Sequence, residues 1–313
     1  MAIHWYPGHM HKANKDMASV LPEIDLIIEL LDARLPYSSA NPLLAKLGAN
    51  LPRIKILSKS DLADPDVTAL WQAHYEQGDA VKTLLTTLTQ ADKAQTVASL
   101  CRKLVPHKDN ATHNIVAMIT GIPNVGKSTL INALAGKAIA KTGNEPAITK
   151  GQQRINLRNG IILLDTPGVL WPKIDNELSG LRLATTGALK DTAINHVEVA
   201  FYAVDYLLQH YPERLRARYD LATLADTDLG FLEQLGARRG CLRGGGQVDL
   251  DKVSTLLLNE LRSGKLGGIS LETPTMVVAE IAALQRKQQE KAAARKDHRL
   301  ARKARRKLAP TSH

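Results

Sequence analysis

Cysteine is scarce in this chain of 313 residues, which contains only Cys101 and Cys241. Two single cysteines so far apart supply neither a disulfide framework nor the clustered thiols of a zinc site. No apolar run reaches the roughly 20 residues of a membrane-spanning helix, and the sequence begins without the apolar core of a signal peptide. Internal repeats and lipidation motifs are also absent. We therefore expect a cytoplasmic protein that does not bind membranes and is long enough for two domains.

The net charge of +10 is concentrated near the carboxyl terminus. Between residues 284 and 308, eleven Lys and Arg stand against Glu290 and Asp297, a local net charge of +9. One interpretation is a solvated, frayed tail. A second, compatible with the first, is a basic arm that binds the phosphate backbone of a nucleic acid. The alanines between the basic residues favour a helix that forms on a polyanion.

A complete phosphate-binding loop, GIPNVGKS, occupies residues 121–128. Its pattern G-x-x-x-x-G-K-[ST] lets successive backbone amides surround phosphate oxygens, because the glycines leave room for them. We expect Lys127 to reach the β- and γ-phosphates and Ser128 to offer a hydroxyl to Mg²⁺. Residues 113–119 are typical of a buried strand and residues 129–134 of a helix start, as such a loop requires. The candidate phosphate-binding residues are Asn124, Val125, Gly126, Lys127, Ser128 and Thr129.

A second motif, DTPG at residues 165–168, follows the apolar residues 160–164. This tetrapeptide alone is a common turn, but its place behind a strand and a phosphate loop favours a metal site. We expect Asp165 to hold Mg²⁺ through water and the amide of Gly168 to donate to the γ-phosphate. Thr149, in the loop between the two motifs, is the expected second hydroxyl ligand of Mg²⁺.

The sequence SKSD at residues 58–61 resembles the guanine-reading motif Asn-Lys-x-Asp. Asp61 is expected to accept two hydrogen bonds that adenine cannot supply, with the stem of Lys59 against the base. Ser58 is shorter than the usual Asn, and we expect it to give up a tether to the phosphate loop. Thr86 lies where a second base-contacting loop is expected. A simple turn at a strand end is the alternative, but beside a phosphate loop the motif indicates GTP.

The order of the motifs is the most specific feature, because the guanine-reading motif precedes the phosphate loop, whereas it follows that loop in ordinary small GTPases. A circular permutation explains this order. The chain resembles the YlqF/RbgA family of circularly permuted, ribosome-assembly GTPases over nearly its full length. The resemblance rests on residues 5–10 (WYPGHM), 32–34 (DAR) with Pro36, Ser38, Ser39, Asn41 and Pro42, residues 121–128 and 165–168, and residues 211–214 (YPER).

The resemblance implies an enzyme that binds GTP and GDP with Mg²⁺ and acts on the precursor of the large ribosomal subunit. In its GTP state it would bind rRNA, and hydrolysis would release it. For the protein off the ribosome, a monomer is the simplest expectation. Val169 stands where many GTPases have a water-orienting Gln, and an apolar side chain cannot orient water. The family points to His9 as the catalytic group instead; alternatively His9 caps a turn or contacts RNA. Asn124 matches the potassium-binding position of similar GTPases, although a structural role is the alternative.

Short apolar strands that alternate with helical stretches predict an α/β fold. We expect a circularly permuted P-loop GTPase domain over residues 1–175, with a mostly parallel sheet and helices on both faces. A smaller all-α, RNA-binding domain (176–280) and a basic, disordered tail (281–313) follow. Strands are expected at 24–31, 53–57, 81–85, 113–119 and 160–164, helices at 67–76, 197–210, 229–235 and 252–261, and a tight loop at 240–246.

A competing hypothesis is an RNA-binding assembly factor that holds GTP with negligible hydrolysis, because Val169 and Ser58 both weaken the catalytic case. A tRNA-modification or membrane-signalling GTPase lacks support in the sequence.

Overall fold

A computed structural model describes residues 19–87, 93–108, 114–140, 153–166 and 176–308 of the chain. The chain divides into two units, Met1–Glu272 and Thr273–His313. The first contains a sheet with its helices and an all-helical part. The second consists of one long helix and the chain end.

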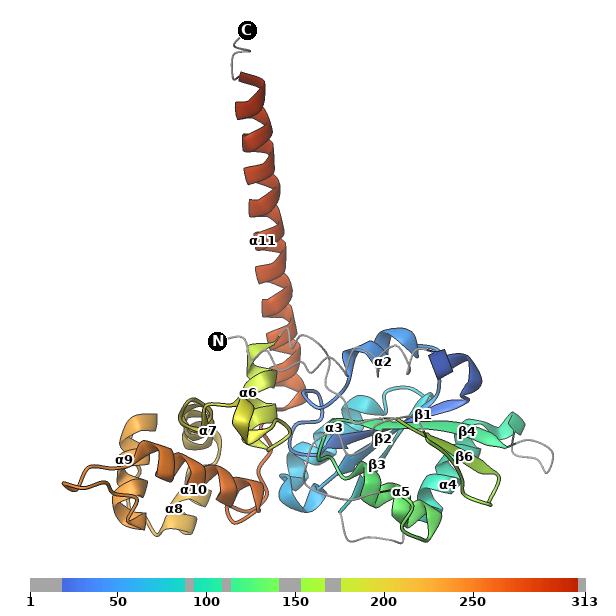
Figure 1. Cartoon of the computed structure of the whole chain (residues 1–313), viewed down its shortest axis with the longest axis horizontal. Coiled ribbons are helices and arrows are strands. Elements are labelled where there is room, and N and C mark those ends of the chain that lie inside the picture. The colour runs from blue at the N-terminus through green and yellow to red at the C-terminus, as the bar shows by residue number, and fades with distance from the viewer. Residues whose placement is uncertain (1–18, 88–92, 109–113, 141–152, 167–175, 309–313) are drawn as a thin grey trace. The chain divides into compact units, whose positions relative to one another are not determined.

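A six-stranded sheet, in the order β3-β2-β1-β4-β6-β5, is the centre of the first unit (Figure 1). All neighbouring strands are parallel except β5 and β6. The strands are β1 (Leu26–Asp32), β2 (Arg53–Ser58), β3 (Val81–Thr86), β4 (Ile115–Gly121), β5 (Gln153–Asn156) and β6 (Ile161–Asp165). This parallel arrangement places the carboxyl ends of five strands at one edge of the sheet.

The central strand β1 is buried along its whole length, as its apolar sequence predicts. Glu29, in the middle of the strand, pairs with Lys55 on β2 at 2.7 Å, and the two residues are direct cross-strand partners. This pairing compensates for the cost of burying a carboxylate.

Helices cover both faces of this sheet, with α2 on one side and α4 and α5 on the other (Figure 1). The bounds are α2 (Pro42–Leu47), α3 (Pro65–Tyr75), α4 (Lys93–Leu104) and α5 (Lys127–Ala135), with short 3₁₀ turns η1 (Leu21–Glu23), η2 (Ser60–Leu62) and η3 (Pro106–Lys108). The predicted α/β architecture is confirmed.

The remaining part of the first unit is helical and packs around α7 (His196–His210), which contacts α6, α8, α9 and α10. These helices are α6 (Glu177–Thr185), α8 (Pro212–Tyr219), α9 (Asp228–Arg239) and α10 (Leu250–Arg262), with the 3₁₀ turn η4 (Asp191–Ala193). Side-chain caps from Asn195, Thr227 and Asp249 begin α7, α9 and α10. Residues 240–246 form the expected tight loop, with Gly245 and Gly246 at positive φ.

The predicted strands and helices are all present, with boundaries that differ by at most four residues. The sequence patterns do not predict α2, α4, α6, α8 and β5. The edge strand β5 has three exposed residues out of four, so no apolar pattern marks it. Its pairing with β6 creates the strand.

The second unit contains α11, which extends from Pro274 to Leu308. The sequence interpretation of residues 281–313 as a disordered tail differs from this helix. The physical reason lies in the composition, because Ala, Lys, Arg, Gln and Glu all have high helix propensity. Among the described residues, no helix is long and apolar enough to span a membrane.

Candidate nucleotide-binding site

The carboxyl edge of the sheet gathers the motif residues. Asp32 on β1 is the direct register partner of Ser58 on β2, which in turn faces Thr86 on β3. On the other side of β1, Gly121 ends β4, and Asp165 ends β6 next to it. Motifs that are far apart in the sequence thus lie side by side because each one terminates a strand.

The phosphate-binding loop requires glycine for steric reasons. A Cβ on Gly121 would lie 2.9 Å from the carbonyl oxygen of Leu30 and 2.8 Å from Cγ1 of Val125, so any side chain there would displace the loop. Asn124 and Gly126 have positive φ values of 59° and 96°. Helix α5 begins directly afterwards at Lys127, so its amino-terminal amides face the loop region, as an anion site requires.

Lys127 forms an ion pair with Asp165, and both side chains are buried. Burial raises the pKa of Asp165 and lowers the pKa of Lys127, while their mutual attraction opposes both changes. The second carboxylate oxygen, Oδ2 of Asp165, is buried without a hydrogen-bond partner in the described parts of the chain. The cation expected to bind phosphate and the carboxylate expected to hold a metal therefore meet at one point.

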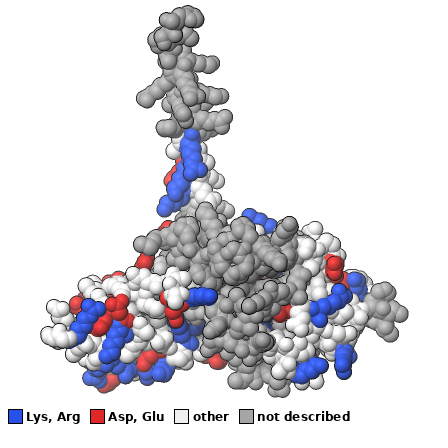
Figure 2. All heavy atoms as spheres, in the orientation of Figure 1, with Lys and Arg blue, Asp and Glu red and all other residues white. Residues whose placement is uncertain are grey.

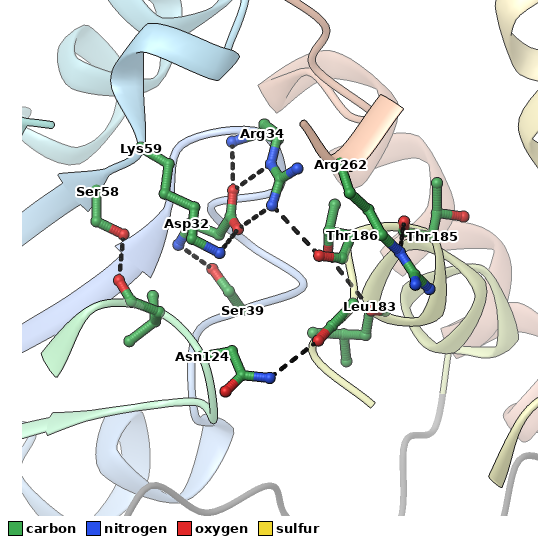
Figure 3. Close-up of polar contacts among 12 residues, drawn as sticks. Asp32, Arg34, Ser39, Ser58, Lys59, Asn124, Leu183, Thr185, Thr186 and Arg262 are labelled. Carbon is green, nitrogen blue, oxygen red and sulfur yellow. Dashed lines mark hydrogen bonds and ion pairs between the residues drawn. The ribbon is translucent and has the colours of Figure 1, made fainter. Parts of the chain in front are cut away.

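Ser58 corrects one sequence-based expectation. Its hydroxyl lies 2.7 Å from the carbonyl oxygen of Val125 in the phosphate loop (Figure 3). The same hydroxyl lies 3.0 Å from the carbonyl oxygen of Leu31. The expectation that serine gives up the tether to the loop is wrong. Only β1 separates β2 from β4, and the loop approaches the end of β2 closely enough for a short side chain to reach its backbone.

Lys59 is oriented by a buried carboxylate. Its Nζ lies 3.2 Å from Oδ2 of Asp32. The same carboxylate accepts two hydrogen bonds from the guanidinium of Arg34, from Nε to Oδ1 at 2.9 Å and from Nη2 to Oδ2 at 2.7 Å (Figure 3). Burial alone would raise the pKa of Asp32, but the charges of Arg34 and Lys59 hold it well below its usual range. Lys59 itself adopts the left-handed conformation, with φ of 55°.

The other base-contact candidates lie close to this group. Asp61 is exposed on η2, directly after β2, where its carboxylate is accessible to a ligand. Thr86 is buried at the end of β3 and donates to the carbonyl oxygen of Thr87 at 3.0 Å. The structure thus brings Ser58, Lys59 and Thr86 to the same edge.

Several candidates lie outside the described residues, namely His9, Thr149, Gly168 and Val169. Their roles stay predictions. Ser128 and Thr129 lie in the first turn of α5 and are half-buried.

The carboxyl-terminal turn of α6 also meets the loops at this edge, and no sequence motif predicts it. The amide of Asn124 donates to the carbonyl oxygen of Gly187 at 3.2 Å, and Arg34 donates to that of Thr186 at 3.4 Å. From the other side, Arg262 of α10 donates to the carbonyl oxygen of Thr185 (Figure 3) and to that of Ala184. The end of α6 therefore joins the phosphate loop to the helical part. The only sequence signal for this turn is Gly187, which has a positive φ.

Comparison with known proteins gives the family of this chain. The family described as 50S ribosome-binding GTPase matches residues 116–227. The ribosome biogenesis GTPase A of Bacillus cereus is 46% identical over 282 residues, which cover 88% of this chain and 95% of that protein. The chain belongs to the ribosome biogenesis GTPase A family. The Thermotoga maritima member is 30% identical over 274 residues, which cover 86% of this chain and 94% of that protein.

A solved structure supports the same assignment. GNP-bound YlqF from T. maritima superimposes with a TM-score of 0.59 at 25% identity, covering 84% of this chain and 98% of that one. Membership in this family confirms the circularly permuted P-loop fold and identifies the chain as a GTPase that binds guanine nucleotides. The residues that the sequence predicts to bind the nucleotide, where the structure describes them, gather at the carboxyl edge of the sheet.

Proposed function

We propose that this GTPase is an assembly factor for the large ribosomal subunit, which binds rRNA in its GTP state and is released on hydrolysis. The observation that carries the proposal is the joining of both nucleotide motifs at one sheet edge, through Ser58 and Val125, in a member of this family. The curated relatives carry the name ribosome biogenesis GTPase A, and the matching family is described as 50S ribosome-binding.

In this proposal the phosphate loop and the strand ends divide the work of nucleotide binding. Lys127 neutralises the β- and γ-phosphates while the backbone amides of the loop, and that of Gly168, surround their oxygens. Lys59, held by Asp32 at 3.2 Å, lies along the base, and Asp61 accepts hydrogen bonds from its edge. Ser58 and Thr86, at the ends of the neighbouring strands β2 and β3, line the base site.

The residues present fit a magnesium ion. Asp165 offers its buried Oδ2, which has no hydrogen-bond partner among the described residues. Ser128 and Thr149 offer hydroxyls, and such oxygen ligands are those that Mg²⁺ prefers. No group of three or more His, Cys, Asp or Glu in the described segments could hold a metal by itself, so phosphate oxygens would complete the coordination. Bound there, Mg²⁺ would neutralise charge on the β- and γ-phosphates.

Asn124 is the proposed ligand of a potassium ion. Its amide nitrogen donates to Gly187, which leaves the carbonyl end of the same side chain for a cation. A monovalent cation beside the phosphates would stabilise the charge that develops during hydrolysis. With Val169 unable to orient water, His9 is the proposed group that positions the attacking water.

The RNA-binding charge is concentrated in the last helix. Residues 176–272 carry eleven Lys and Arg against thirteen Asp and Glu, a net charge of −2. Several of these cations are already paired, such as Arg218 with Glu260 and Arg238 with Asp220, and Figure 2 shows both signs interspersed over this part. We propose that the net charge of +9 in residues 284–308 supplies the electrostatic attraction to rRNA.

The helical part would then contribute by its shape. We therefore keep the division into a GTPase domain (1–175), a helical RNA-contacting domain (176–280) and a basic tail (281–313) as a proposal.

The test is GTP turnover by the full chain in K⁺ and in Na⁺ buffer, with and without large ribosomal subunits. We expect strong stimulation by the subunit and faster turnover in K⁺. The variant His9→Ala should lose stimulated turnover and still bind GTP. GTP binding without stimulation would instead favour an RNA-binding factor that barely hydrolyses its nucleotide.

A further inference from the structure

A short segment, residues 268–272, connects the region after α10 to the start of α11 and lies against the base-contacting loops. We call it the strap. Its side chains are almost fully buried, with exposed fractions of 2% for Ile269, 1% for Ser270 and 0% for both Leu271 and Glu272. A segment without helix or strand that is buried to this degree must place its polar groups on specific partners.

The strap bonds directly to the chain that follows Asp61. The amide of Ile269 donates to the carbonyl oxygen of Leu62 at 2.9 Å. One residue later, the hydroxyl of Ser270 accepts from the amide of Asp64 at 3.2 Å. Two hydrogen bonds therefore hold the segment on which Asp61 lies, from outside the motif itself.

The same strap bonds to the group that orients Lys59. The amide of Leu271 donates to the carbonyl oxygen of Arg34 at 2.7 Å, and Arg34 holds Asp32, the partner of Lys59. Glu272 accepts from the next loop residues through the amides of Tyr37 and Ser38, at 2.6 and 2.9 Å. Both base-contacting side chains are thus supported by one segment.

Close approach of the two backbones makes Gly268 necessary. A Cβ at this position would lie 2.4 Å from the carbonyl oxygen and 3.0 Å from the carbonyl carbon of Ala63. Both contacts are with backbone atoms, so a side chain could be accommodated only if the strap or the loop after Asp61 moved.

A tyrosine links this arrangement to the helical part. Tyr211, at the junction of α7 and α8, accepts from the amide of Ser270 at 3.2 Å. Its hydroxyl also lies 3.2 Å from the carbonyl oxygen of Ser270 and 3.3 Å from Oδ2 of Asp64. Burial raises the pKa of Tyr211 to about 12, so this hydroxyl stays protonated and can donate to one of the two.

We propose that the strap is part of the guanine-recognition apparatus, in that residues 268–272 position Asp61 and Lys59 against the base. This inference rests on the proposed base-reading role of Asp61. Because the strap begins where the helical part ends and is bonded to Tyr211, a displacement of the helical part changes the affinity for guanine. Nucleotide discrimination thus depends on residues about 200 positions after the motif.

The experiment compares the dissociation constants of GDP and IDP for the full-length chain by fluorescence titration. IDP lacks the 2-amino group and makes one hydrogen bond fewer to a carboxylate, so the ratio of the two constants reports the placement of Asp61. For Gly268→Ala we expect the Kd of GDP to rise about tenfold and that of IDP about threefold, since hydrogen bonds to a charged group are weakened. The ratio of the Kd of IDP to the Kd of GDP then falls about threefold.

The matched control is Gly78→Ala, also in the first unit, because no atom lies within 4 Å of the position that a Cβ on Gly78 would occupy. In this variant the dissociation constants of GDP and IDP should be unchanged. Ser270→Ala removes only the acceptor for Asp64 and should lower the ratio to a smaller extent, which covers the case in which Gly268→Ala fails to fold.

The variant Asp61→Asn tests the base-reading role of Asp61 separately from the positioning role of the strap. If Asp61→Asn keeps the preference for GDP over IDP, the proposed role of Asp61 is wrong. If Asp61→Asn loses the preference while Gly268→Ala and Ser270→Ala both keep it, the inference about the strap alone is overturned. An equal rise of both constants in Gly268→Ala would also overturn it, since that pattern indicates general destabilisation.

Discussion

Replacing Ser58 by alanine removes the hydroxyl that joins the SKSD segment to the phosphate loop. Ser58 is 2% exposed, and its bond to the carbonyl oxygen of Val125 is 2.7 Å long. Leaving a buried carbonyl without its donor costs about 1–3 kcal/mol. For a folding unit of this size, about 1 kcal/mol corresponds to roughly 2–4 °C in Tm. We therefore expect the Tm of Ser58→Ala to be several degrees lower than that of the unchanged protein.

The affinity for GDP should change together with stability. If about 1 kcal/mol of the loss appears in binding because the loop is no longer held for phosphate, the Kd of GDP rises roughly fivefold. Thermal unfolding with and without GDP, together with a GDP titration, measures both quantities. Ser60→Ala is the control, because the half-buried Ser60 side chain makes no hydrogen bond with any described residue. Equal changes in Tm and in the Kd of GDP for Ser58→Ala and Ser60→Ala would show that the Ser58 hydroxyl has no such role.

Two other predictions concern the neighbouring groups. Asp32 has a pKa below its unfolded value of 3.8, so its ion pairs stabilise the fold above that pH and are lost as the pH falls below it. Asp32→Asn should lower the free energy of unfolding by about 3 kcal/mol near neutral pH. Urea titrations at several acidic pH values should also show a smaller loss of this free energy as the pH falls. An unchanged slope of the free energy of unfolding against pH would contradict this prediction. Asn124→Ala removes the 3.2 Å bond to Gly187 and should lower the free energy of unfolding by about 1 kcal/mol. In the proposed potassium role, it should also reduce GTP turnover in K⁺ to the rate in Na⁺, and persistence of the K⁺ advantage would exclude Asn124 as the ligand.

Local signals made most of the sheet predictable. Strands β4 and β6 are largely continuous apolar runs, and β1 is interrupted only by Glu29 before its end. Such runs are typical of parallel strands covered on both faces. The phosphate loop is also local, because its conformation depends on glycines at fixed spacing and on a helix that begins at Lys127. The circular permutation followed from the order of motifs, which needs no knowledge of contacts.

Contacts between distant residues escaped sequence analysis. Ser58 was expected to lose its tether because serine is shorter than asparagine, and only the proximity of Val125 shows that its length suffices. The carboxyl-terminal turn of α6 has no motif, yet Asn124, Arg34 and Arg262 all bond to it.

The sequence by itself determined the ligand class and the order of the strands along the chain, because glycine spacing and apolar runs act over a few neighbouring residues. The tertiary structure alone decided what holds the base-contacting residues in place. Arg34, Leu62 and Asp64 receive their partners from residues 269–271, and hydrogen bonds between residues so far apart leave no periodic pattern in the sequence.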